Sequence, residues 1–323
     1  MMRRFTSFAV ITLALLMIVA AAQAQTSTGP RRPAGVPADF VITPFGYYHP
    51  SCVNHLAAGD VLRSDKKGID RADGTFHAIT CAYPHYRADG EKVIGDERGV
   101  KDPNISHAWV EWASVYNTAS SYGFQWGFWN VPPAPLSKDG QTLYFFNGLE
   151  DINDVVTIIQ PVLGWNSDYA NAWGIAAWNC CVNGAVNEGP PTPVASGDLI
   201  YGYTFETCGS GIESCGTWDI VAWDLTNRNF SDLVNTSSYG QTFNWAFGGV
   251  LEVYNVIKCN DYPDGNADGY VGAGPSIHFY NQGLEDYNFV TVKNPAWTIG
   301  RTTGLSPGCG YGGSSPREVV LKY

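Results

Sequence analysis

From residue 107 onward the chain is a succession of short aromatic and β-branched stretches, punctuated by Gly, Pro, Asn and Asp. No window in this region shows a sustained helical period with capping residues at its ends. Short strands at this spacing predict an antiparallel all-β sandwich or barrel. The expected strands lie within residues 124–129, 142–146, 155–163, 172–178, 199–205, 217–223, 245–257 and 276–280.

The first residues have the pattern of a secretory signal peptide. A basic start at Arg3 and Arg4 is followed by an apolar stretch over residues 8–22 and by the small-x-small site Ala22-Gln23-Ala24. The apolar stretch is shorter than the roughly 20 residues that a membrane span needs. We therefore expect residues 1–24 to be removed and the mature protein to be secreted, either outside the cell or into a periplasm.

Composition divides the mature chain into three parts. Residues 25–40 are rich in Pro, Thr and Gly and are predicted to be a linker. Residues 41–105 are more polar and are predicted to form a small β-rich N-terminal module held by a disulfide. Residues 106–323 are predicted to form the β-sandwich domain, which has ample length to bury a two-sheet core.

All eight cysteines lie in the mature chain, and an even number in an exported protein predicts disulfides. Cys208 and Cys215 bracket a short loop and are predicted to pair. Cys52 with Cys81 and Cys259 with Cys309 are further plausible pairs. The pairing of the adjacent Cys180 and Cys181 stays open.

Charge and motif content exclude several functional classes. The formal net charge of −11 becomes −13 once Arg3 and Arg4 are removed, which argues against nucleic acid or an anionic membrane as a partner. The chain has no CxxC or paired-His zinc pattern, and the Asx-rich turn at Asp264 has Pro275 where a calcium loop needs Glu. We therefore predict no metal and no cofactor. Serine-nucleophile and phosphate-loop motifs are absent from the sequence.

Two expected strands place a strongly polar side chain among apolar ones. Gln160 shares a strand face with Ile158 and Val162, because side chains alternate with a period of two. Glu252 shares a face with Val250 and Tyr254 by the same rule. A Glu and a Gln on facing strands can activate a water molecule and hold an oxyanion. A partnered structural Glu is the competing interpretation of Glu252.

These motifs resemble the glutamic peptidases of the eqolisin type, which are secreted β-sandwiches of concanavalin-like jelly-roll architecture active in acid. The resemblance covers about residues 121–280 and leaves the N-terminal module outside. It rests on Gln160 in its Ile-Ile-Gln strand, the Trp173 strand, the Ser196-Gly197-Asp198 turn and the Glu252 strand. A closer likeness is to secreted fungal and bacterial proteins of concanavalin-like type that share the motifs at residues 145–150, 158–165 and 251–256.

The resemblance implies that Gln160 and Glu252 form a catalytic dyad, with Glu252 as general base and then acid and Gln160 as oxyanion donor. The same segments contain Glu150, Trp165, Trp173 and Tyr254, which we predict to contact the substrate. This sequence departs from the family pattern at Ile175, where the family has Glu, and at Gly248, where it has the upstream Glu of that strand. Part of the shell that supports the dyad therefore differs.

The sequence thus predicts a secreted, monomeric, disulfide-bonded endopeptidase-like hydrolase that acts in acid on a polypeptide. A lectin-like module that binds glycans through its tryptophans, with Gln160 as a hydrogen-bonding residue, is the alternative. A structural exported domain without a small ligand is a third interpretation.

Overall fold

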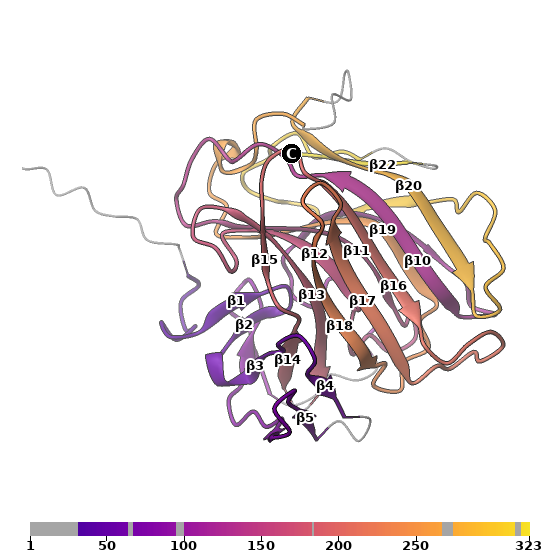
Figure 1. Ribbon diagram of the computed structural model, residues 1–323. Helices are drawn as coiled ribbons and strands as arrows, with labels where there is room; N and C mark the ends of the chain where they lie inside the picture. The colour runs from indigo at the N-terminus through magenta and orange to yellow at the C-terminus, as the bar shows by residue number, and fades with distance from the viewer. Residues whose placement is uncertain (1–31, 64–66, 95–99, 183, 267–273, 314–317) are drawn as a thin grey trace, which may run out of the picture.

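The computed structural model describes residues 32–63, 67–94, 100–182, 184–266, 274–313 and 318–323, of which Cys181 and Val182 are described for their backbone only. The predicted signal peptide lies outside these residues, as does part of the Asx-rich turn that begins at Asp264. Two sheets pack face to face and form an all-β sandwich, as expected (Figure 1). No helix in the described residues is long and apolar enough to cross a membrane.

The smaller sheet of the sandwich, called the small sheet below, is antiparallel throughout. Its strands alternate sharply between residues that pack against the other sheet and residues that face outward, as a one-sided sheet requires. In spatial order its described strands are β18 (Asn229–Ser237), β17 (Thr217–Asp224), β16 (Leu199–Glu206), β10 (Tyr122–Asn130), β20 (Ser276–Asp286) and β22 (Val319–Lys322).

The larger sheet, called the large sheet below, is covered on both faces. Its central strand β11 is buried at every position, which explains why its sequence does not alternate between apolar and polar residues. In spatial order its described strands are β21 (Thr298–Arg301), β9 (Trp109–Tyr116), β19 (Trp245–Tyr254), β11 (Thr142–Glu150), β12 (Gln160–Trp165), β13 (Trp173–Val182), β14 (Ala185–Glu188) and β3 (Val53–His55), with β15 (Thr192–Val194) paired to β13.

The strand expected over residues 155–163 begins later than predicted, at Gln160. Upstream of it, Ile159 makes an isolated bridge with Leu149. The backbone N–H of Val155 donates to the Val100 carbonyl at 2.8 Å, and that of Val156 donates to the Gln241 side chain at 2.9 Å. These bonds to loops keep the preceding segment out of the sheet.

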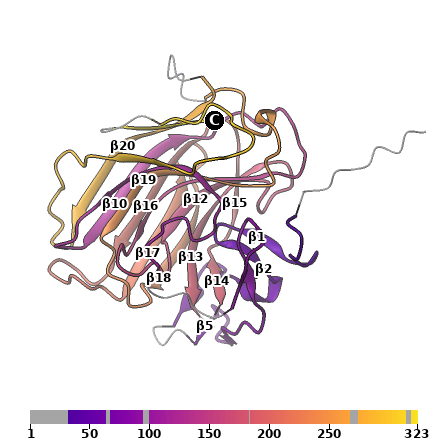
Figure 2. The same cartoon turned by 180° about the vertical axis from the view of Figure 1, so that it is seen from behind.

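N-terminal segments gather on one side of the sandwich, drawn in indigo to purple in Figures 1 and 2. The strand β3 extends the large sheet by pairing in parallel with β14. The remaining N-terminal strands form two further sheets that are separate from the sandwich. One contains β1 (Val41–Thr43), β2 (Gly46–Tyr48), β7 (His85–Tyr86) and β8 (Lys92–Val93), and the other contains β4 (Val61–Leu62), β5 (Gly68–Asp70) and β6 (Phe76–Ala78). Short 3-10 turns occur at Pro50–Cys52 and Cys259–Asp261. The boundary at residue 105 stays a prediction.

Two hydrophobic cores follow from this arrangement. One lies between the two sheets and contains Phe145, Leu163 and Phe279. The other lies on the opposite face of the large sheet and joins Phe146 and Trp178 to residues of the N-terminal module. We call this second face the outer face of the large sheet.

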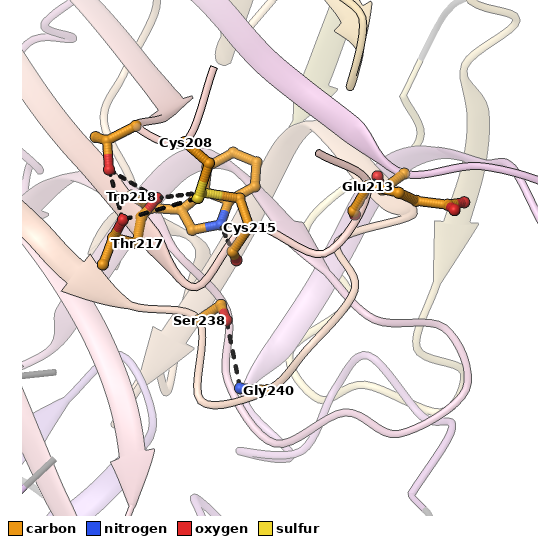
Figure 3. The surroundings of a disulfide bond; sticks show 9 residues. Cys208, Glu213, Cys215, Thr217, Trp218, Ser238 and Gly240 are labelled. Atoms are coloured by element: carbon orange, nitrogen blue, oxygen red, sulfur yellow. Dashed lines mark hydrogen bonds between the residues drawn. A yellow bond between two sulfur atoms is a disulfide. The ribbon is translucent and has the colours of Figure 1, made fainter. Parts of the chain in front are cut away.

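Disulfides connect Cys52 to Cys81, Cys208 to Cys215 and Cys259 to Cys309, which confirms the three pairs considered from the sequence. Cys180 is disulfide-bonded as well. Around the Cys208–Cys215 bond, the Trp218 indole donates to the Cys215 carbonyl at 3.2 Å (Figure 3). This contact anchors the disulfide loop at the start of β17.

Candidate functional site

Gln160 and Glu252 lie on the same face of the large sheet. The side chains that alternate in phase with them, Ile158, Val162 and Val250, all belong to the core on the outer face. Both Gln160 and Glu252 are fully buried. The alternation of side chains along each strand therefore places these two polar side chains on one surface, as predicted.

A bulge in β19 keeps Glu252 in phase with the outer face. The pairing of β19 with β9 shifts between Phe247 and Gly249, yet Phe247 and Val250 both pack on the outer face. A Cβ on Gly249 would lie 2.7 Å from the Phe279 ring, so a larger residue would clash with the small sheet. Glycine at this position thus allows the extra residue of the bulge.

The carboxyl of Glu252 is held by neighbouring hydrogen-bond donors. The Trp109 indole donates to Oε2 at 3.2 Å, and the Tyr254 hydroxyl donates to Oε1 at 2.7 Å. Burial raises the pKa of Glu252 to about 8, and these hydrogen bonds offset only part of the rise. At acid and neutral pH Glu252 is therefore protonated in this structure, and a protonated carboxyl cannot accept a proton as a general base.

The register of the large sheet separates Glu252 from Gln160. Glu252 is opposite Tyr144 on β11, and Tyr144 is opposite Gly164 on β12, four residues beyond Gln160. Two strand spacings and four residues of rise place the two Cα atoms about 16 Å apart. The two side chains share a face, but the register does not bring them to one water molecule.

Glu150 lies much closer to Gln160. The pairs Phe146 with Val162 and Leu149 with Ile159 place Gln160 opposite Gly148, so Glu150 is its diagonal neighbour on the adjacent strand. Diagonal residues have Cα atoms about 7–8 Å apart, within reach of two long side chains. Neither the Glu150 carboxyl nor the Gln160 carboxamide has a hydrogen-bond partner among the described residues.

The electrostatics of Glu150 also favour its neutral form. Burial raises its pKa well above the usual range, and the negative charge of Asp102 raises it further. The protonation state of Glu150 therefore depends on how completely the outer face is covered.

The other predicted contacts divide between the two faces. Tyr254 lies on the outer face and bonds to Glu252. Trp165 and Trp173 pack against each other in the core between the sheets, on the opposite face from Gln160. Both indoles are buried, and they take no part in a site on the outer face.

The N-terminal module covers the outer face. The Tyr47 ring packs edge-on against Tyr254 with centroids 5.5 Å apart, and Phe45 packs against Trp178. The hydroxyl of Tyr144 donates to the carbonyl of Ile42 at 3.4 Å. The segment from β1 to β2 therefore covers Tyr254, Trp178 and Tyr144 on the outer face.

No motif in the sequence marks Trp109, which holds Glu252, or Tyr144, which lies between Glu252 and the N-terminal module. Trp109 is 143 residues from Glu252, and its hydrogen bond arises from the pairing of β9 with β19. No local pattern in the sequence signals such a contact.

One cluster with metal-ligand atoms occurs among the described residues, formed by Asp89, Glu91 and His107. All three are exposed. The Arg87 guanidinium donates to Glu91 at 3.1 Å and lies 2.9 Å from the His107 ring. A positive group thus already occupies the cluster and disfavours a cation there.

Similar solved structures include scytalido-glutamic peptidase with a transition state analog inhibitor. This likeness has a TM-score of 0.45 and 16% sequence identity, and it covers 67% of this chain and 98% of that chain. SCP-B, a member of the Eqolisin family of peptidases, was solved in a complex with the tripeptide Ala-Ile-His and has a TM-score of 0.43 and 15% identity. These structures belong to the family that the sequence resembles. No protein-family model and no curated protein sequence matches the chain.

Proposed function

We propose that this protein is a hydrolase of peptide bonds whose chemistry takes place on the outer face of the large sheet. The observation that carries the proposal is the diagonal pair of Glu150 and Gln160, a carboxyl and a carboxamide that are buried and have no hydrogen-bond partner among the described residues. Buried polar groups without partners cost free energy, and a functional role is one reason for a protein to keep them.

The two groups have complementary roles in attack by water on a peptide carbonyl. An ionised Glu150 takes a proton from the water as it attacks, and the Gln160 amide N–H donates to the oxyanion that develops. The protonated Glu150 then delivers its proton to the leaving amine. Glu252, predicted from the sequence as the base, is a second acid on the same face, held by hydrogen bonds from Trp109 and Tyr254.

Access to the site requires displacement of the N-terminal module. A substrate reaches Glu150 and Gln160 only after β1 and β2 leave the outer face. Water then replaces the covering residues, and the pKa of Glu150 falls toward the ordinary value for a carboxyl. The same event that admits the substrate therefore gives Glu150 the ionised form that a base needs in weak acid.

The test is hydrolysis of a denatured protein across the acid range by a Phe45→Ala variant, in which the module is loosened. In this background, Glu150→Gln is expected to lower kcat by about 100-fold or more, because general acid–base catalysis contributes at least that much. Glu206→Gln is the matched control, since Glu206 is also buried and without a partner among the described residues, but belongs to β16 of the small sheet.

Two results would decide against this assignment. Loss of activity in Glu252→Gln but not in Glu150→Gln would return the role of base to Glu252. Absence of cleavage at every acid pH, by the wild type and by Phe45→Ala, would end the hydrolase proposal. Circular dichroism of each variant confirms that the fold is retained.

A further inference from the structure

The exposed face of the small sheet, on the far side of the sandwich from Glu150, presents an aromatic row. Cross-strand pairing aligns one aromatic residue from each of five neighbouring strands, and these residues are Tyr280, Phe128, Tyr201, Trp223 and Phe230. Directly opposite residues share a face, so the row runs across the strands from β20 to β18. Four strand spacings give it a length of about 19 Å.

Two shorter aromatic rows run beside the first. Trp126 is paired with Tyr203 on β16, and Phe124 with Phe205. The Trp126 indole lies over Gly283 of β20, where a Cβ would come within 1.8 Å of the ring. Glycine thus lets the indole rest on the sheet, and the ring stays partly exposed.

The exposure of this face increases toward β18. Trp223 is 39% exposed and Phe230 is 55% exposed, while the rings on β10, β16 and β20 are half-buried by one another. The rings of Phe128 and Tyr201 are stacked with centroids 4.6 Å apart. A contiguous aromatic surface of this kind on the outside of a folded domain marks an interaction site.

The charge of the face indicates the chemistry of its ligand. The five strands β10, β16, β17, β18 and β20 contain no Lys or Arg. Asp219 and Asp232 alternate in phase with the aromatic residues of β17 and β18 and flank the rows. A face with aromatic rings, hydroxyls and carboxylates repels anionic polymers, and it offers acceptors to a ligand that is rich in hydroxyl groups.

We infer that this face binds a neutral, linear, β-linked polysaccharide along the aromatic row. The C–H faces of pyranose rings pack on aromatic side chains, while their hydroxyls bond to the flanking carboxylates and tyrosine hydroxyls. A row of rings spread across five strands suits an extended glycan chain and does not suit a coiled one. The inference is independent of the proposed hydrolase, because the two sites lie on opposite faces of the sandwich.

The test measures binding of cellohexaose to the full chain by calorimetry, with maltohexaose as the coiled counterpart. We expect the wild type to bind cellohexaose more tightly than maltohexaose. The substitutions Trp223→Ala and Phe230→Ala should each weaken binding about fivefold to tenfold, the effect of losing one aromatic contact. Phe76→Ala is the matched control, since Phe76 is also 55% exposed but belongs to β6 of the N-terminal module.

Three outcomes would overturn the inference. Absence of cellohexaose binding by the wild type would do so directly. Equal binding by the wild type, Trp223→Ala and Phe230→Ala would place the glycan elsewhere. A wild-type dimer that Trp223→Ala converts to a monomer in sedimentation, with no glycan binding, would assign the face to self-association.

Discussion

Glu252 shows how the surroundings of one residue reverse its expected chemistry. Its unfolded carboxyl titrates near 4.5, while burial raises the folded pKa to about 8. The folded chain therefore keeps a proton that the unfolded chain releases between these two values. The stability that this proton contributes is fully present below pH 4.5 and is lost as the pH rises through 8.

The raised pKa predicts the behaviour of Glu252→Gln, which mimics the protonated acid. At pH 5 the variant should have a free energy of unfolding similar to that of the wild type, because both side chains are neutral. At pH 9 it should be the more stable of the two, because the wild type must then bury a charge. Urea denaturation at both pH values measures the difference, and a difference that does not change with pH would contradict the prediction.

The side-chain positions show what a sequence can and cannot predict at this scale. The period of two correctly places Gln160 and Glu252 on one face, because each strand has an apolar set that fixes its phase. The same rule applied to Trp165, five residues from Gln160, would have placed this indole on the opposite face, where the structure has it. The offset between Gln160 and Glu252 depends on the register of β11 with both neighbours, and no local pattern encodes it.

At the scale of elements, the disulfides close loops of very different length. Cys208 and Cys215 are 7 residues apart, while Cys259 and Cys309 are 50 apart. In the chain-entropy model, the longer loop gives about 4 kcal/mol of stability and the shorter one about 2.5 kcal/mol. Replacing both Cys259 and Cys309 by Ser should therefore lower the free energy of unfolding more than replacing both Cys208 and Cys215. Equal losses in guanidinium titrations would argue against this ranking.

Element types were predictable because aromatic and β-branched stretches between turn residues leave few alternatives to strands. The strand from residue 155 was placed too early, since Val155 and Val156 bond to loops that the sequence does not reveal as neighbours. The position of β1 and β2 over the outer face was also beyond the sequence, because it depends on contacts such as that of Tyr47 with Tyr254.

At the scale of the whole molecule, several buried acids make the free energy of unfolding depend on pH in the same direction. Burial raises the pKa of Glu111 and Glu206 to about 7 and that of Glu252 to about 8. Each of these groups is protonated in the folded chain and charged in the unfolded chain between pH 4.5 and its own folded pKa. The free energy of unfolding should therefore fall as the pH rises from about 5 to about 8. Thermal melting across this range tests the slope, and a rise of Tm toward pH 8 would refute it.

The parallel pairing of β3 with β14 has a consequence for any shortened form of the protein. Residues 53–55 form hydrogen bonds with backbone donors and acceptors of β14 that would otherwise have no strand partner. In a product that begins after residue 55, β14 would become an unpaired edge strand, and exposed edge strands promote aggregation. Removal of the N-terminal residues would thus expose the buried acids but would also lower the solubility of the protein. A cleaved N-terminal segment that stayed paired with β14 would avoid this loss.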